Sequence, residues 1–458
     1  MKSIHYAGAW ALFLFLGSQT GWAATLTLSE AMGVAYETNP QLDAARAGQR
    51  VNDEGVNQAE ANWRPTVNLN GSYGYETLQV GSGGYNPLPE TLASHPLNAG
   101  VQLSQNVYRG GRTAAEISKA KATVRAGIAQ LTLTEEGVLL DAATAYMNLV
   151  RDEATLLYRE DNVAALQKQL DASEEEFKVG ELTRTDVAQS RARLADSQAD
   201  LVNAQGELEV SRSNFEHVIG RPAETLETNP PIPRLPDTQE QAVDLAMQSN
   251  PAIVQALENA KAADYAVVDA IGALLPTVSI DAQYQLTQDS LESTYGTSVQ
   301  HVTSLIGQLT VPIYQGGAED SAVRQAKDQR AQAEIEVADT ERQTVASTQT
   351  AWQAYVVAKG SIASDQIAVS ANREAYDGVR AEQQVGSRTV LDVLNAQQEL
   401  LNAQVAFVGA QRDAQVAAYQ LLSALGWLTA KKLALPVQVY DPAKNYEENS
   451  TRWFGFGN

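Results

Sequence analysis

The chain has 458 residues and a formal net charge of −22, and it contains no cysteine. The acidic balance argues against a surface that binds phosphate groups, so no nucleic-acid partner is expected. The missing cysteines exclude a disulfide framework, a thiolate metal site and a cysteine-linked lipid anchor, so packing or oligomerisation must hold the fold.

The N-terminus carries the pattern of a secretory signal peptide. Lys2 precedes an apolar stretch from Ala7 to Leu16, and Gly21-Trp22-Ala23 ends in a small-x-small pattern. The apolar stretch is too short to anchor the chain across a bilayer. We therefore expect residues 1–23 to be removed by cleavage near Ala23; a buried N-terminal helix is the alternative. No later segment reaches the ~18 continuous apolar residues of a membrane helix.

The rest of the chain is an internal duplication. The motif Asn39-Pro40 recurs as Asn250-Pro251, and Tyr108-x-Gly110-Gly111 recurs as Tyr314-x-Gly316-Gly317. These matches define a first repeat over residues 24–228 and a second over residues 238–428. The linker between them, residues 229–237, is rich in proline and cannot be helical. Residues 429–458 are left as a C-terminal tail, either packed at the equator of the molecule or disordered.

Each repeat opens with a segment of helical periodicity, the first from Ser29 to about Asn62, and continues with two strands. The strands are expected at about 65–76, 99–108, 276–287 and 301–313. Apolar residues alternate in them with Thr, Ser, Asn and Gln, as in a barrel strand with lipid on one side and water on the other. A soluble sandwich alternates in the same way. Aromatic residues at the strand ends favour a membrane interface; they are Trp63, Tyr75, Tyr108 and Tyr314.

Long helices follow the strands in both repeats. Apolar residues recur there every seven positions, which is typical of coiled coils; the first series is Ala142, Leu149, Leu156, Val163 and Leu170. The expected helices span about 113–178, 183–219, 318–384 and 388–425, with turns at Val179-Gly180 and Val385-Gly386. A helical bundle in a soluble protein is the alternative.

The fold class predicted is an α+β membrane protein built from a repeated helix-strand-strand-helix-helix unit. Four strands cannot close a barrel, and an open sheet edge is not tolerated in lipid. Two, three or four chains would therefore have to share one barrel, and three would give twelve strands.

Three stretches resemble the signature motifs of the TolC family, the outer-membrane factors of type I secretion and multidrug efflux. They are Leu309–Gly317, Val385–Val393 and Ser423–Gly426, and the likeness covers essentially the whole mature chain. The resemblance implies a homotrimer with a shared 12-stranded β-barrel continued by a coiled-coil α-helical barrel. It also implies a periplasmic adaptor (membrane fusion) protein and an inner-membrane ABC, RND or MFS transporter as partners. Such ducts catalyse no reaction and need no cofactor.

The same resemblance assigns roles to residues near the helical turns. Arg388 falls on the family's latch arginine, and Thr185 and Asp186 fall on its partners in the neighbouring chain. Asp392 falls on the first constriction aspartate. Two positions depart from the family pattern: Asn395 replaces the second constriction aspartate, and Gln383 replaces the latch tyrosine. The tips expected to dock the adaptor are Val179, Gly180, Val385 and Gly386.

Both aspartates also have a purely structural interpretation. Thr183-x-x-Asp186 and Thr389-x-x-Asp392 each match a capping box at the start of a helix. Capping and a role in the pore are compatible.

Two other classes of protein fit the sequence less well. An enzyme is disfavoured, because the histidines lie far apart with no ligand-spaced neighbours and no metal site is expected. A periplasmic coiled-coil adaptor or structural protein without a pore would explain the heptads and the signal peptide, but not the lipid-patterned strands.

Overall fold

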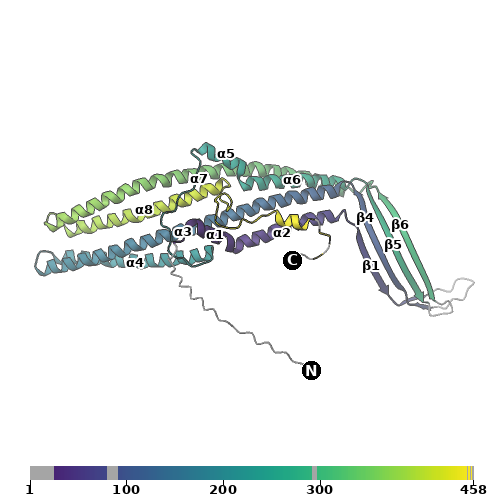
Figure 1. Ribbon diagram of the computed structural model, residues 1–458, viewed down its shortest axis with the longest axis horizontal. Coiled ribbons are helices and arrows are strands. Elements are labelled where there is room, and N and C mark those ends of the chain that lie inside the picture. The colour runs from purple at the N-terminus through teal and green to yellow at the C-terminus, as the bar shows by residue number, and fades with distance from the viewer. Residues whose placement is uncertain (1–24, 80–90, 291–296, 451, 454, 456–458) are drawn as a thin grey trace, which may run out of the picture.

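The computed structural model describes residues 25–79, 91–290, 297–450, 452–453 and 455. The predicted signal peptide, residues 1–23, lies outside these ranges. The chain is elongated, with paired long helices at one end and a sheet at the other (Figure 1).

Each repeat begins with two helices, where the sequence analysis expected one. The first pair is α1 (Leu28–Thr38) and α2 (Pro40–Ala61), and the second is α5 (Gln239–Ser249) and α6 (Pro251–Gly272). The single helix predicted from Ser29 to Asn62 is therefore wrong. Proline disfavours helical backbone in the residue before it, and Asn39 has ψ 120° and caps α2 by accepting a bond from the Gln41 N–H at 2.9 Å. Asn250 repeats this break before α6.

The main sheet has four antiparallel strands in the order β1-β4-β5-β6. They are β1 (Thr66–Tyr73), β4 (Leu97–Arg109), β5 (Thr277–Ser290) and β6 (Thr297–Thr310). A short hairpin of β2 (Glu76–Gln79) and β3 (Thr91–Ser94) lies between β1 and β4, where the two repeats differ in length. The last strand begins four residues earlier than expected, at Thr297. It also ends earlier, at Thr310, because Pro312 lacks the N–H that continued pairing needs.

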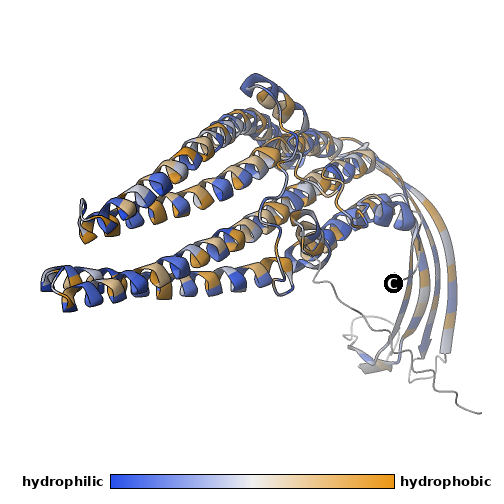
Figure 2. Cartoon of the chain, turned by 60° about the vertical axis from the view of Figure 1, so that its left-hand side comes forward, coloured by the Kyte–Doolittle hydropathy of each residue, from blue (hydrophilic) through white to orange (hydrophobic). Residues whose placement is uncertain are grey.

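The two faces of this sheet differ in polarity along every strand. Residues directly opposite each other in antiparallel strands share a face, and one such row is Val67, Leu103, Ala282 and Leu305. The next row is Asn68, Gln102, Gln283 and Ser304. Figure 2 shows the resulting alternation of colours along the strands. The apolar face is exposed, with Leu69 at 80% and Leu305 at 76%. In a single chain this face has no cover within the described residues.

Four long helices form two hairpins at the far end (Figure 1). The first hairpin is α3 (Arg112–Lys178) with α4 (Arg184–Ile219), and the second is α7 (Ala318–Gln384) with α8 (Val390–Ala424). In the part of the chain that is described, no helix is both long and apolar enough to cross a membrane.

The largest core cluster lies where α1, α3 and α4 meet the segment after α8. Tyr146 of α3 is fully buried there, and its hydroxyl donates to the Leu26 carbonyl at 2.7 Å. Ala430 and Leu435 of the C-terminal tail belong to the same cluster. This part of the tail is therefore packed at the equator, and it continues into the short helix α9 (Lys444–Asn449).

Candidate functional site: the helical tips and the sheet junction

The two helical hairpins end in turns of the same construction. Gly180 and Gly386 both adopt left-handed backbone, with φ of 83° and 80°. In each turn the next residue donates its N–H back to the helix: Glu181 to the Glu176 carbonyl and Ser387 to the Glu382 carbonyl, both at 2.9 Å. The predicted glycine caps are thus confirmed. The turns leave Val179 73% and Val385 80% exposed, so two apolar side chains project at the tips.

Both predicted capping boxes are present. The Asp186 carboxylate accepts from the Thr183 N–H at 3.0 Å, and the Asp392 carboxylate accepts from the Thr389 N–H at 3.0 Å. These bonds favour the charged form and lower the pKa of both aspartates, chiefly through the Thr183 side chain for Asp186 and through the Thr389 backbone for Asp392. The bonds use one oxygen of each carboxylate, Oδ2. Each aspartate therefore stays ionised at the tip.

Arg388 lies beside Asp392 on the α7–α8 turn. Its Nε donates to Glu382 Oε2 at 2.8 Å, and this contact raises its pKa. Within one chain, no hydrogen bond among the described residues joins Arg388 to Thr185 or Asp186. Gln383 is half-buried and accepts the Gly386 N–H through its carbonyl. The residues expected to form the latch thus lie on two separate turns.

Asn395 has a partner that the sequence analysis missed. Arg193 of α4 donates from Nη2 to Asn395 Oδ1 at 3.1 Å, which links the two hairpins near their tips. Arg193 follows Asp186 by seven residues, so both lie on the same face of α4. This spacing places Arg193 on the face of α4 that carries Asp186, but it does not identify Asn395 as the partner. Where the TolC pattern has a second aspartate, this chain therefore has an asparagine that binds a cationic side chain.

Below the turns, α8 is seated on the first hairpin. Val390 and Leu394 of α8 pack with Leu166, Leu170 and Leu194 in one buried cluster. A polar layer follows: Gln397 Nε2 donates to Asn162 Oδ1 at 2.8 Å, and Asn162 Nδ2 donates to Ser197 Oγ at 2.9 Å. Buried polar groups are costly when unpaired. The layer therefore fixes the height at which α8 sits on α3 and α4.

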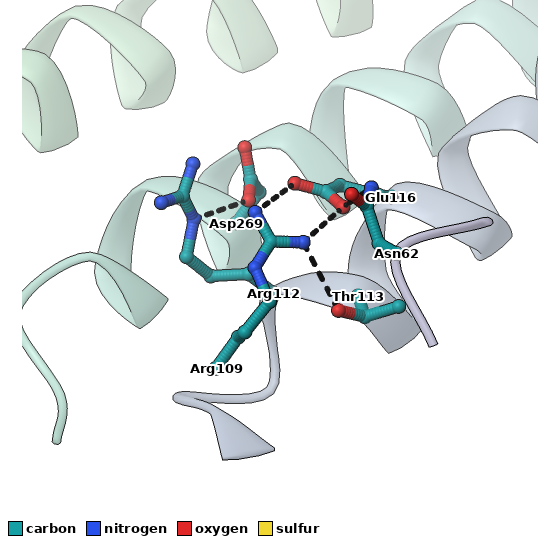
Figure 3. Close-up of polar contacts among 6 residues, drawn as sticks. All are labelled: Asn62, Arg109, Arg112, Thr113, Glu116 and Asp269. Carbon is teal, nitrogen blue, oxygen red and sulfur yellow. Dashed lines mark hydrogen bonds and ion pairs between the residues drawn. The ribbon is translucent and has the colours of Figure 1, made fainter. Parts of the chain in front are cut away.

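A second polar cluster joins the sheet to the helices (Figure 3). Arg109 at the end of β4 pairs with Glu116 at 2.9 Å and donates to Thr113 Oγ1 at 3.1 Å. Asn62 of α2 donates to the same Glu116 at 2.8 Å, and Arg112 pairs with Asp269 of α6 at 3.0 Å. Arg109 thus binds the end of β4 to α3, and residues of the same turn of α3 bind the end of α2 and α6. None of the residues that make these polar contacts was predicted from the sequence as a functional residue.

The Gly110-Gly111 turn makes this junction compact. Gly110 has φ 64°, and a Cβ there would lie 2.2 Å from the Gly272 carbonyl oxygen. Only glycine fits such an approach. The strand can therefore pass directly into α3 with no intervening loop.

Among the described residues, no group of three or more His, Cys, Asp or Glu side chains could hold a metal ion. What the geometry supplies is a two-faced sheet joined firmly to helical hairpins with charged tips.

Comparisons with known proteins agree with this geometry. The family model described as outer membrane efflux protein matches residues 32–221 and 242–427. The outer membrane efflux protein BepC of Brucella suis is 35% identical over 442 residues, covering 95% of this chain and 93% of that protein. The outer membrane protein TolC of Escherichia coli is 26% identical over 460 residues, covering 95% and 90%. The CmeC outer membrane channel of Campylobacter jejuni shares the fold, with a TM-score of 0.74 at 18% identity, covering 93% of this chain and 89% of that one.

Proposed function

The chain belongs to the outer membrane efflux protein family, and we propose that three copies of it close into one duct from the periplasm to the cell exterior. The protein is an outer-membrane channel with a periplasmic extension, and it is the exit duct of an efflux or type I secretion system. It conducts substrates passively, and its partners supply the energy.

The two free edges of the sheet carry this proposal. Within the described residues, β1 pairs only with β4 and β6 pairs only with β5. Unpaired backbone groups cannot remain in lipid, since each costs several kcal/mol there. Pairing β6 of one copy with β1 of the next removes both edges at once. Three copies give twelve strands, with the apolar row outside and the Asn, Gln and Ser row lining water.

The helices have matching free sides. The helix layer runs α2-α3-α6-α7 near the sheet, and α4 flanks α3 near the tips. One side of the chain thus ends in β1, α2 and α4, and the other ends in β6 and α7. The same rotation that joins β6 to β1 therefore brings α7 against the α2 and α4 side of the next copy. Head-to-tail contacts of this kind close into a ring when the rotation between copies is a whole fraction of a turn, here one third.

The tips would form the periplasmic gate. Arg388 of one copy would bind Thr185 and Asp186 of the next, and release of this contact would open the mouth. Three copies of Asp392 would form a ring of carboxylates that attracts cations. Asn395 contributes no charge to that mouth, and Gln383 supplies no tyrosine hydroxyl.

The partners would meet the same end of the molecule. Val179, Gly180, Val385 and Gly386 form the exposed apolar turns, which suit docking of a periplasmic adaptor. An inner-membrane ABC, RND or MFS transporter would then deliver the substrate. The duct itself would carry out no enzymatic step and bind no cofactor.

Bilayer recordings on two matched variants test the gate. Asp186→Asn and Asp392→Asn weaken equivalent capping boxes. Asp186→Asn also removes a proposed partner of Arg388 and should raise the conductance, but only Asp392→Asn should reduce cation preference and block by multivalent cations. Arg388→Ala should raise the single-channel conductance. If Asp392→Asn and Asp186→Asn both kept the selectivity of the unsubstituted protein, capping would be the only role of Asp392. A mature protein that is monomeric and soluble without detergent would overturn the duct itself.

A further inference from the structure

The C-terminal tail runs along α2 toward the sheet. Asn445 of α9 donates from Nδ2 to Asp53 Oδ2 at 2.8 Å, and Asp53 also accepts from Gln49 at 3.0 Å. Asp53 is 1% exposed, so this contact ties the tail into the interior of the helix layer. The tail is therefore attached before it reaches its end.

The end of the tail is held a second time by Arg64. Arg64 Nη1 donates to the Arg452 carbonyl at 3.1 Å, and its guanidinium lies 5.1 Å from the centroid of the Trp453 ring. Arg64 stands two residues before β1 begins at Thr66. These contacts place Trp453 at the level where the chain enters the sheet. Its side chain is nevertheless 61% exposed.

Other exposed aromatic residues lie at the same end of the strands. Trp63 is 47% exposed, Tyr108 is 44% exposed and Tyr314 is 81% exposed. Trp and Tyr collect at membrane–water interfaces, because their rings are apolar while their N–H or O–H groups need polar partners. In the proposed barrel this end of the sheet faces the periplasm. The three residues thus mark the periplasmic interface of the bilayer.

We propose that Trp453 inserts into the periplasmic leaflet of the outer membrane, so that the tail is a strap between the equator and the lipid. This inference rests on the proposed function. A duct needs an open bore, so a segment added to it can lie only on its outer surface. Arg64 supports the choice of lipid as partner. Its ion pair with Glu60 is long, at 3.6 Å, and its side chain is 21% exposed, so part of the guanidinium can reach a headgroup phosphate.

The absence of cysteine allows a direct test by site-specific labelling. Arg452→Cys carries an NBD fluorophore beside Trp453, and Lys444→Cys carries the same label at the start of α9 as the matched control. Lys444 is 72% exposed at its side chain and forms only a weak 3.9 Å pair. Both proteins are reconstituted in phosphatidylethanolamine–phosphatidylglycerol vesicles with a nitroxide on the lipid headgroup region, or with iodide in the buffer.

The lipid nitroxide should quench the label at 452 at least twofold more than the label at 444. Trp453→Ser should remove this difference, and Trp453→Phe should preserve most of it. Quenching at 452 by iodide alone would place the tail in water, and quenching by neither agent would place it against another copy of the chain. Either result overturns the strap.

Ion conductance of the same vesicles separates the two proposals. If the vesicles conduct ions but the lipid nitroxide does not quench the label at 452, the strap is wrong and the duct stands. Vesicles that neither conduct nor show quenching overturn the duct, and the strap with it.

Discussion

The two longest helices of the molecule, α3 and α7, have the same length and opposite surroundings. Each has 67 residues and occupies the same place in its repeat. On α3, buried residues recur from Thr113 to Ser173. On α7 only Ala326, Thr344, Thr348 and Ala358 are buried. Duplication has therefore preserved the element and changed what it packs against.

The difference follows from where each helix lies in the layer. Helix α3 contacts α2, α4, α6 and α8, so its own chain surrounds it, whereas α7 has neighbours on fewer sides. Apolar side chains remain on its open face, with Ile335 69%, Val357 65% and Ile367 69% exposed. Apolar side chains gathered on one free face indicate a missing partner. In the proposed trimer that partner is the next copy.

The largest expected effect comes from placing a charge at equivalent positions of the two helices. Ala129 of α3 is 5% exposed, and Ile335 stands at the equivalent position of α7. Ala129→Asp puts an unpaired carboxylate into the interior of one chain, which costs several kcal/mol and should abolish folding. Ile335→Asp should leave the helical content of the chain unchanged and lower the yield of detergent-stable trimer at least tenfold, because each of three interfaces loses an apolar contact.

Circular dichroism and light scattering in detergent measure these two outcomes. Ile335→Val keeps the apolar contact and serves as the control, which should assemble normally. If Ile335→Asp assembled as well as the control, the open face of α7 would not be a contact between copies.

A smaller effect is expected when only volume is removed. Leu139 is fully buried on α3, and Leu139→Ala should lower the free energy of unfolding by about 2–5 kcal/mol. Its counterpart on α7 is Val345, which is only half-buried within the chain. Val345→Ala should cost about 1 kcal/mol or less, since fewer methyl groups leave a cavity. Urea titrations followed by helical circular dichroism compare the two, and equal losses would mean that the two environments do not differ.

Local patterns predicted much of this fold. The Gly-Gly pairs mark where α3 and α7 begin, and the Val-Gly pairs mark where they end, because left-handed backbone requires glycine. The two-residue alternation of the strands predicted both faces of the sheet. The break at Asn39-Pro40 was also readable in the sequence, since a proline at the first helical position is a start signal, and it was overlooked.

Contacts between elements were not predictable in the same way. Leu149 and Tyr355 occupy the same position of the seven-residue pattern in the two repeats. Leu149 is nevertheless fully buried, while Tyr355 is only partly buried. A seven-residue period shows which face of a helix packs, but not whether the partner lies in the same chain. The Arg193–Asn395 and Arg109–Glu116 contacts depend on how helices and strands are rotated against each other, which no local pattern records.

The last contrast between α3 and α7 is one of protonation. Glu136 of α3 is 2% exposed, and burial raises its pKa to about 8, against the opposing effect of Lys432. The neighbouring Glu135 carboxylate adds to the rise. At the equivalent position α7 carries Arg342, which is exposed. At this position α3 therefore holds a carboxyl group that is neutral in the folded chain over a pH range in which it is ionised in the unfolded chain, whereas α7 holds a guanidinium.

The contribution of Glu136 to the stability of the fold falls as the pH rises. Between pH 4.5 and about 8 the folded chain binds a proton at Glu136 that the unfolded chain has released. The stabilisation is complete below pH 4.5 and is lost as pH rises to about 8, with a slope of at most about 1.4 kcal/mol per pH unit. Glu136→Gln keeps the size of the side chain without the titrating proton and should reduce this slope, while Arg342→Gln should leave it unchanged. Urea midpoints measured from pH 5 to pH 9 decide the point. An unchanged slope in Glu136→Gln would assign the effect to Glu135, Asp141 or Glu153, the other α3 carboxyl groups whose pKa burial raises.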